Sequence, residues 1–186
     1  PNVFSLHPWN ETEDPVAITA ELVRSAAPSS RVVAVGDQMW ARFLVDLMPL
    51  LPGTQYRRSV DVIGSLRMRK DSAEIEALRA AGSAVDKIAA ELQAGRIALV
   101  GRTEAQVSAD LSARIIAQGH DVVNFAIVAA GENAASPHHH PGSRVIQPNE
   151  IVLCDFGGTM NGYCSDITRC VYTGEPSSEV AEAYAV

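Results

Sequence analysis

The 186-residue sequence lacks the features that would place it in several common classes of protein. Its basic residues are not in excess, because 15 Lys and Arg stand against 22 Asp and Glu, and the formal net charge is −7. A general nucleic-acid binder needs a basic surface for phosphates, so this class is disfavoured. The longest apolar run lies near Phe125–Ala130, whereas a membrane-spanning helix needs about 20 apolar residues. We therefore expect neither nucleic acid nor a membrane as a partner.

Cysteine is also scarce, and its pattern excludes two further roles. Cys154, Cys164 and Cys170 are spaced ten and six residues apart, which fits no zinc-binding pattern, and three is an odd number for a disulfide framework. No cationic base lies beside Cys154 or Cys164 in the sequence, so neither is expected to be a nucleophile. We interpret them as reduced thiols of a cytoplasmic protein.

What the sequence does contain begins with alternating strand and helix signals in its first third. The pattern predicts strand, helix, strand, helix and strand over Asn2–His7, residues 15–26, Arg31–Val35, residues 39–50 and Tyr56–Ile63. This order indicates a small α/β layer. Its glycines Gly36 and Gly53 are isolated, so the layer carries no glycine-rich loop of the kind that binds nucleotide phosphates.

A domain boundary is expected between residues 65 and 66, and two helices follow it. Asp71 with Glu74 and Thr103 with Gln106 form capping-box patterns. Each precedes apolar residues at helical spacing, with the helices ending near residues 95 and 119. Because the apolar faces of both helices carry no cluster of titratable residues, we interpret them as core packing helices.

The last third predicts a β-hairpin that carries two aspartates. Strands are expected over Ile151–Phe156 and Tyr163–Tyr172, with Gly157–Gly162 as the turn segment. Asp155 lies in the first strand and Asp166 in the second. Aspartate is depleted in strands, so two aspartates at these positions need a physical reason.

The alternation of side chains along strands places both carboxylates on one face. If the hairpin is centred on Met160–Asn161, Asp155 and Asp166 are directly opposed. If Asn161–Gly162 form the turn, Asp155 faces Thr168 and Asp166 lies diagonally across. In either register the carboxylates are neighbours, and neighbouring carboxylates repel each other unless a cation lies between them. Carboxylate oxygens suit hard divalent ions, so a bound metal ion would relieve this repulsion.

The aspartates can also be accommodated without a metal ion, in either of two ways. They can belong to a solvated sheet face that has no ligand at all. Alternatively, Arg144 and Arg169 are close enough in the sequence to pair with them.

A histidine-containing loop precedes the hairpin. His138 lies 17 residues before Asp155, within the segment Pro137–Pro141. A histidine near a metal site can bind the metal, transfer a proton or hold a substrate carbonyl. We expect His138 to face the aspartates, and His139 and His140 to lie more peripherally in an exposed turn.

Together these segments resemble a known family. Gly131–His139, Val145–Gly158 and Gly162–Arg169 are similar to the pita-bread metallopeptidases, in particular to their prolidase and Xaa-Pro aminopeptidase branch. Arg67–Glu76 is similar to the family's junction between two domains. The resemblance implies a partial α/β N-terminal domain of the creatinase/prolidase type over residues 1–65. It implies the N-terminal half of an α+β pita-bread catalytic domain over residues 66–186.

The resemblance also implies roles for four residues. Asp155 matches a metal ligand, Asp166 matches the aspartate that bridges two metal ions, and His138 matches the histidine that contacts substrate near the scissile bond. Thr168 occupies the place of a group that supports the bridging aspartate. The implied cofactors are two divalent metal ions, with manganese as the first expectation and cobalt or zinc as alternatives.

The implied function is hydrolysis of the Xaa-Pro bond in dipeptides or at peptide N-termini, by a cytoplasmic homodimer that acts on peptide substrates. The metal ions of such an enzyme polarise the scissile carbonyl. Two rivals share the scaffold, namely a metal-free creatinase-like amidinohydrolase and a non-catalytic binding protein. The presence of both Asp155 and Asp166 argues against them.

The resemblance further implies metal ligands that this sequence does not contain. The family has five protein ligands, and the other three, a histidine and two glutamates, come later in the chain. His140 is the last histidine here. We therefore expect the chain to be an internal fragment that is inactive by itself.

Overall fold

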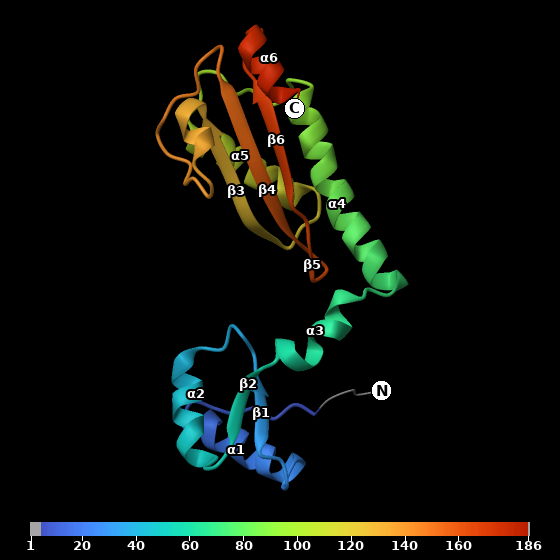
Figure 1. Cartoon of the computed structure of the whole chain (residues 1–186), viewed down its shortest axis with the longest axis vertical. Coiled ribbons are helices and arrows are strands. Elements are labelled where there is room, and N and C mark those ends of the chain that lie inside the picture. The colour runs from blue at the N-terminus through green and yellow to red at the C-terminus, as the bar shows by residue number, and fades with distance from the viewer. Residues whose placement is uncertain (1–4, 186) are drawn as a thin grey trace. The chain divides into compact units, whose positions relative to one another are not determined.

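The computed structural model describes residues 5–185, and the chain divides after Lys70 into two compact units (Figure 1). The first unit contains, in chain order, α1 (Pro15–Ala26), β1 (Val32–Val35), α2 (Ala41–Leu47), the 3₁₀ helix η1 (Met48–Leu50), β2 (Gln55–Arg58) and α3 (Val60–Met68). Strands β1 and β2 pair in parallel. This unit is the small α/β layer that the sequence predicts.

The core of the first unit is formed by its helices. Val16 and Ala20 of α1 are buried together with Leu47 of α2 and with Leu51, which comes directly after η1. The Asp14 side chain accepts a hydrogen bond from the Val16 N–H at 2.9 Å and so caps α1, as the Asp-Pro pair predicts.

Two strand predictions in this unit need comment. The expected strand Asn2–His7 lies partly outside the described residues, and its described residues 5–7 are not in a strand. The strand predicted over Tyr56–Ile63 is wrong beyond Arg58, because α3 begins at Val60. Its β-branched residues favour a strand locally, but Asp61 in the first turn favours a helix. The boundary expected between residues 65 and 66 lies inside α3.

The second unit is a four-stranded sheet covered on one face by two helices. Its elements are α4 (Ser72–Gln93), α5 (Glu104–Ala117), β3 (Val122–Ala130), the 3₁₀ helix η2 (Gly131–Ala135), β4 (Ile151–Met160), β5 (Tyr163–Cys164), β6 (Ile167–Tyr172) and α6 (Ser178–Tyr184). Strand β4 is central, with β3 antiparallel on one side and β5 and β6 antiparallel on the other.

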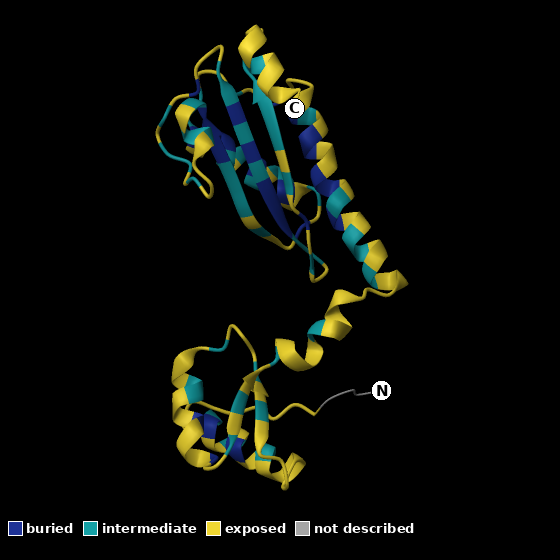
Figure 2. Ribbon diagram, viewed as in Figure 1, coloured by how far each residue is buried: buried dark blue, intermediate teal, exposed yellow. Residues whose placement is uncertain are grey.

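The core of the second unit lies between the sheet and helices α4 and α5. The buried residues of β4 alternate along the strand, with Val152, Cys154 and Phe156 fully buried against residues of both helices. Figure 2 shows this buried band along β4 and along the sheet-facing side of α4. Both predicted capping boxes are present, at Asp71 and Thr103, so the prediction of two core packing helices is confirmed.

The two sides of the sheet therefore differ in chemistry. Residues that alternate with the buried ones, such as Asp155, point to the side opposite α4 and α5, and Asp155 is half-buried. None of the helices among residues 5–185 combines the length and the apolar character that a membrane-spanning segment requires.

Candidate metal and substrate site

The two aspartates line one cavity. Asp155 lies within β4, and Asp166 lies in the short break between β5 and β6. Both carboxylate residues line a cavity of about 560 Å³, whose other walls come from β3 residues 124–127 and from the loop residues 138–141. The prediction that they share a face is confirmed, but the prediction of one continuous strand over Tyr163–Tyr172 is wrong at Asp166.

The turn at the end of the hairpin determines which residues oppose each other. Asn161 and Gly162 have φ values of 50° and 81°, as in the type I′ turn that Asn-Gly sequences favour. Met160 then pairs with Tyr163, and Asp155 pairs with Thr168. The second of the two predicted registers is therefore the observed one, and Asp166 lies diagonally across from Asp155.

A glycine lets the Asp166 segment approach β4. A Cβ atom added to Gly157 would lie 2.1 Å from the Ser165 carbonyl oxygen and 3.2 Å from the Asp166 Cα. No side chain larger than hydrogen fits there without displacing the backbone. Gly157 thus permits the break between β5 and β6 in which Asp166 is presented.

Thr168 supports an aspartate, but not the expected one. Its hydroxyl donates a hydrogen bond to Asp155 Oδ1 at 2.8 Å. We expected Thr168 to support Asp166, and the observed register accounts for the difference, because Thr168 is directly opposite Asp155. A hydroxyl donor at this distance orients the carboxylate and leaves its second oxygen available to a ligand.

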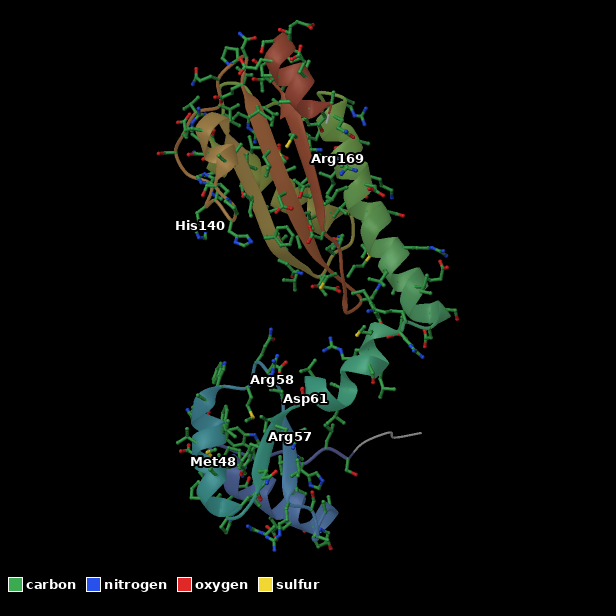
Figure 3. The ribbon with its side chains drawn as sticks, viewed as in Figure 1. Met48, Arg57, Arg58, Asp61, His140 and Arg169 are labelled. Carbon is green, nitrogen blue, oxygen red and sulfur yellow. The ribbon has the colours of Figure 1, made fainter. Side chains whose placement is uncertain are left out.

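The two arginines considered as partners of the aspartates bind elsewhere. Arg144 pairs with Glu150 at 2.8 Å and with Glu132 at 3.2 Å, and these carboxylates raise its pKa. Arg169 donates a hydrogen bond to the Thr168 carbonyl oxygen at 2.8 Å. Figure 3 shows Arg169 on the side of β6 near α4, away from His140 on the loop beside β3. Within residues 5–185, neither aspartate forms an ion pair with an arginine.

The histidine loop reaches the same cavity, although not as expected in every detail. His138 is exposed, has a φ of 55° and lines the cavity. His140 is also exposed and lines it. The expectation that His139 is more peripheral than His138 is wrong, because His139 is half-buried and its Nε2 lies 2.8 Å from Glu104 Oε2.

Glu104 is the residue that sequence reasoning missed. It is the first residue of α5, and 1% of it is exposed. Burial raises the pKa of its carboxyl, but hydrogen bonds from Asn133, His139, Ala130 and Gly142 lower the pKa by more, so the pKa lies below its ordinary value. A glutamate at a helix start is ordinary, because its negative charge interacts favourably with the helix dipole. No feature of the neighbouring sequence indicates its distant partners.

A second buried polar pair lies behind Asp166. His120 Nε2 lies 2.8 Å from Ser165 Oγ, and both residues are buried. Ser165 Oγ also accepts the Gly158 N–H at 3.2 Å. The sequence does not predict this pair, because a single histidine after Gly119 looks like any other polar residue at a helix end.

The cysteines occupy three different environments. Cys154 is buried in the core, Cys170 is half-buried and Cys164 is exposed, and all three are free thiols. Burial, with a smaller contribution from Cys170, raises the pKa of Cys154 to about 12. A thiol of this kind is protonated near neutral pH and is a poor nucleophile.

The described residues do not form a complete metal site. Among residues 5–185, no group of three or more His, Cys, Asp and Glu side chains is arranged to hold a metal ion. The site as described consists of two carboxylates and a histidine loop that line the same cavity.

Comparison with known proteins identifies the family. The model of metallopeptidase family M24 matches residues 75–186, which is more than half of the chain. The chain therefore belongs to metallopeptidase family M24.

Three similar proteins agree with this assignment. The probable dipeptidase PepE of Mycobacterium tuberculosis is 38% identical over 179 residues, which cover 96% of this chain and 46% of that protein. An Xaa-Pro dipeptidase of Lactobacillus delbrueckii subsp. lactis is 33% identical over 181 residues, covering 95% of this chain and 48% of that protein. The crystal structure of a prolidase from Thermococcus sibiricus has a TM-score of 0.86 and 31% identity, covering 97% and 49% of the two chains.

These matches confirm the resemblance to the pita-bread prolidases and the mixed α/β fold expected from the sequence. The chain spans about half the length of the curated relatives it matches.

Proposed function

We propose that this chain forms part of the catalytic site of a metal-dependent peptidase that hydrolyses the Xaa-Pro bond of dipeptides or of peptide N-termini. The observation that carries the proposal is that Asp155 and Asp166 line one cavity together with His138. The names of the relatives support it, because they include a dipeptidase, an Xaa-Pro dipeptidase and a prolidase.

The chemistry of the two aspartates fits divalent metal ions. Both are oxygen donors on one face, no arginine pairs with either among the described residues, and Thr168 donates to Asp155. We assign Asp155 as the ligand of one metal ion and Asp166 as the ligand shared by two, with manganese first and cobalt or zinc as alternatives. The remaining ligands that the family resemblance implies are not among these 186 residues. When bound, such ions polarise a carbonyl and activate water.

His138 and the apolar wall of the cavity complete the proposed substrate site. In this proposal His138 donates a hydrogen bond to the substrate near the scissile carbonyl, where charge develops during hydrolysis. Phe125, Ile127 and Pro141 line the same cavity, and their apolar surfaces suit the ring of a proline residue.

We extend the proposal to the organisation of the enzyme. Residues 66–186 are assigned to the N-terminal half of the pita-bread catalytic domain, and residues 1–65 to a partial N-terminal domain. We propose a homodimer located in the cytoplasm, which suits a chain with three free thiols. Light scattering of the purified protein tests the dimer.

The function is tested with the complete gene product that contains this sequence. After removal of metal with a chelator, manganese, cobalt or zinc is added back. Hydrolysis is then measured on Xaa-Pro dipeptides, on longer Xaa-Pro peptides and on Xaa-Ala dipeptides as the matched control. We expect metal-dependent release of the N-terminal residue, with a preference for Xaa-Pro over Xaa-Ala.

Each alternative has its own outcome in this experiment. Equal rates on Xaa-Ala and Xaa-Pro dipeptides would indicate a general dipeptidase, which the 38% identity to a probable dipeptidase makes the second candidate. Full activity on creatine after chelation would indicate the amidinohydrolase. Absence of all hydrolysis with metal restored would indicate the binding protein.

A further inference from the structure

The buried carboxylate of Glu104 connects α5 to the segment that carries His138. Only 1% of Glu104 is exposed, and a charged residue is rarely buried to this extent unless its charge is fully hydrogen-bonded. Glu104 itself does not line the cavity formed by the aspartates and histidines. Its burial therefore serves something besides direct contact with a ligand.

Both oxygens of Glu104 are used, and each accepts two hydrogen bonds. Oε1 accepts the Ala130 N–H at 2.9 Å and the Asn133 side-chain N–H at 2.9 Å. Oε2 accepts from His139 Nε2 at 2.8 Å and from the Gly142 N–H at 3.3 Å. The first two partners come from the end of β3 and from η2. The other two, His139 and Gly142, lie before and after His140 in the loop.

These contacts define the conformation of the histidine loop. The ring nitrogen of His139 is turned to Glu104, whereas its neighbours His138 and His140 are exposed, and all three histidines line the cavity. His138 also has a φ of 55°, a conformation that a residue other than glycine rarely adopts without restraint from its surroundings. The hydrogen bond at His139 supplies such a restraint at the adjacent residue.

We propose that Glu104 is a positioning residue for His138, and that it acts by holding His139 and the backbone on both sides of the histidine loop. This inference rests on the proposed peptidase function for the role of His138. Glu104 has no contact with the reacting atoms in this arrangement, and its effect on hydrolysis passes through the loop.

The first test replaces Glu104 with glutamine in the complete gene product. All four partners of Glu104 are N–H donors, so Glu104→Gln directs an NH₂ group at one pair of donors. We expect kcat/KM for an Xaa-Pro dipeptide to fall on the order of 10²-fold, mainly through kcat, as for a displaced catalytic group. Asp110→Asn is the matched control, because Asp110 lies on the same helix and pairs with Arg102 and Arg114. It should retain the activity.

The second test distinguishes positioning from general stability. In a His138→Ala background, Glu104→Gln should cause little further loss of kcat/KM, because the group that it positions is already gone. An equal loss in both backgrounds would overturn the proposal.

The third test uses His139. The Nε2 of glutamine can donate to Glu104 as the imidazole Nε2 does, so His139→Gln should lose less activity than His139→Ala. Equal losses in these two variants would overturn the role of the hydrogen bond. These variants also keep the test valid if Glu104→Gln does not fold.

A readout that is independent of activity separates this inference from the proposed function. Amide hydrogen exchange at Ala130 and Gly142 should be slow in the wild type. In Glu104→Gln it should be fast, while exchange in the core of β4 is unchanged. If the wild type hydrolyses no Xaa-Pro substrate with metal present, the proposed function fails, and this exchange pattern still decides whether Glu104 holds the loop. Unchanged exchange at both amides would overturn the inference.

Discussion

The imidazole Nε2 of His120 lies 2.8 Å from the hydroxyl oxygen of Ser165, and the residue after Ser165 is the proposed metal ligand Asp166. The Ser165 backbone N–H donates to the Gly158 carbonyl oxygen at 2.8 Å, and the Ser165 hydroxyl accepts the Gly158 N–H at 3.2 Å. Ser165 is therefore held from two sides, by β4 and by His120. The position of the Asp166 backbone follows from these bonds.

Replacement of Ser165 by alanine should destabilise the fold. It would leave His120 Nε2 without this partner, and His120 Nδ1 is already buried without one among the described residues. A buried polar group that loses its partner costs about 1–3 kcal/mol of unfolding free energy. Chemical denaturation of Ser165→Ala measures this cost, with the exposed helical Ser83→Ala as control. Equal stability of the two variants would contradict the structural role of the pair.

Gly157→Ala should disturb the hairpin at the Asp166 segment. The added Cβ would lie 2.1 Å from the Ser165 carbonyl oxygen, and such overpacking costs about 1–3 kcal/mol or more. Gly82→Ala is the control, because no atom outside the neighbouring helix backbone lies within 4 Å of its added Cβ. This helical position should gain up to about 1 kcal/mol. Thermal unfolding of both variants gives the comparison, and a neutral Gly157→Ala would argue against the close approach.

His138→Ala tests the proposed substrate contact. In the complete gene product it should lower kcat/KM for an Xaa-Pro dipeptide by roughly 10²–10⁴-fold, the usual contribution of a positioned acid or base. His7→Ala is a suitable control, because His7 is exposed and belongs to the other unit. An unchanged rate for His138→Ala would reject its role, even if the enzyme is a metal-dependent peptidase.

Acid should destabilise the wild type more steeply than Glu104→Gln. Burial raises the pKa of Glu104, but its four hydrogen bonds lower the pKa by more, so the folded-state pKa is below the ordinary 4.5. The resulting stabilisation is complete above the ordinary pKa and is lost as the pH falls below about 4.5 through the folded-state pKa. Urea unfolding of both proteins between about pH 3 and 6 measures the difference. Parallel pH profiles would show that Glu104 does not titrate as described.

The 186-residue chain by itself is expected to bind manganese weakly and to show no peptidase activity. Two neighbouring carboxylates without further ligands mainly repel each other, and a metal ion needs enough donors in place. Titration calorimetry should therefore show no tight site, and Asp155→Asn should change the heat of titration little. A stoichiometric pair of tightly bound ions would contradict the proposal that Asp155 and Asp166 are only part of the set of metal ligands.

The elements that the sequence predicts well are those determined by neighbouring residues. The capping boxes at Asp71 and Thr103 are local patterns, and both helices begin there. The register of the hairpin could be narrowed to two alternatives because the Asn161–Gly162 turn and the alternation of strands are also local. The choice between the two registers needed the structure.

The features that sequence reasoning missed depend on distant partners. Glu104 bonds to residues 26 to 38 positions away, and His120 bonds to Ser165, 45 positions away. Neither residue type is unusual where it stands. The strand prediction after Arg58 was wrong for another reason. The β-branched residues of this segment favour a strand, and Asp61 alone was too weak a helix signal to outweigh them.

The Asn161–Gly162 turn has a consequence for how sequences of this hairpin can change in length. With two turn residues, the residue opposite Asp155 is Thr168. A residue inserted into the turn lengthens the loop and leaves this pairing intact. A residue inserted within β5 shifts the following residues of the hairpin by one position, so their side chains move to the opposite face of the sheet. Insertions near the turn should therefore be tolerated at its tip and be harmful a few residues away, where they would move Asp166 to the helix-covered side of the sheet.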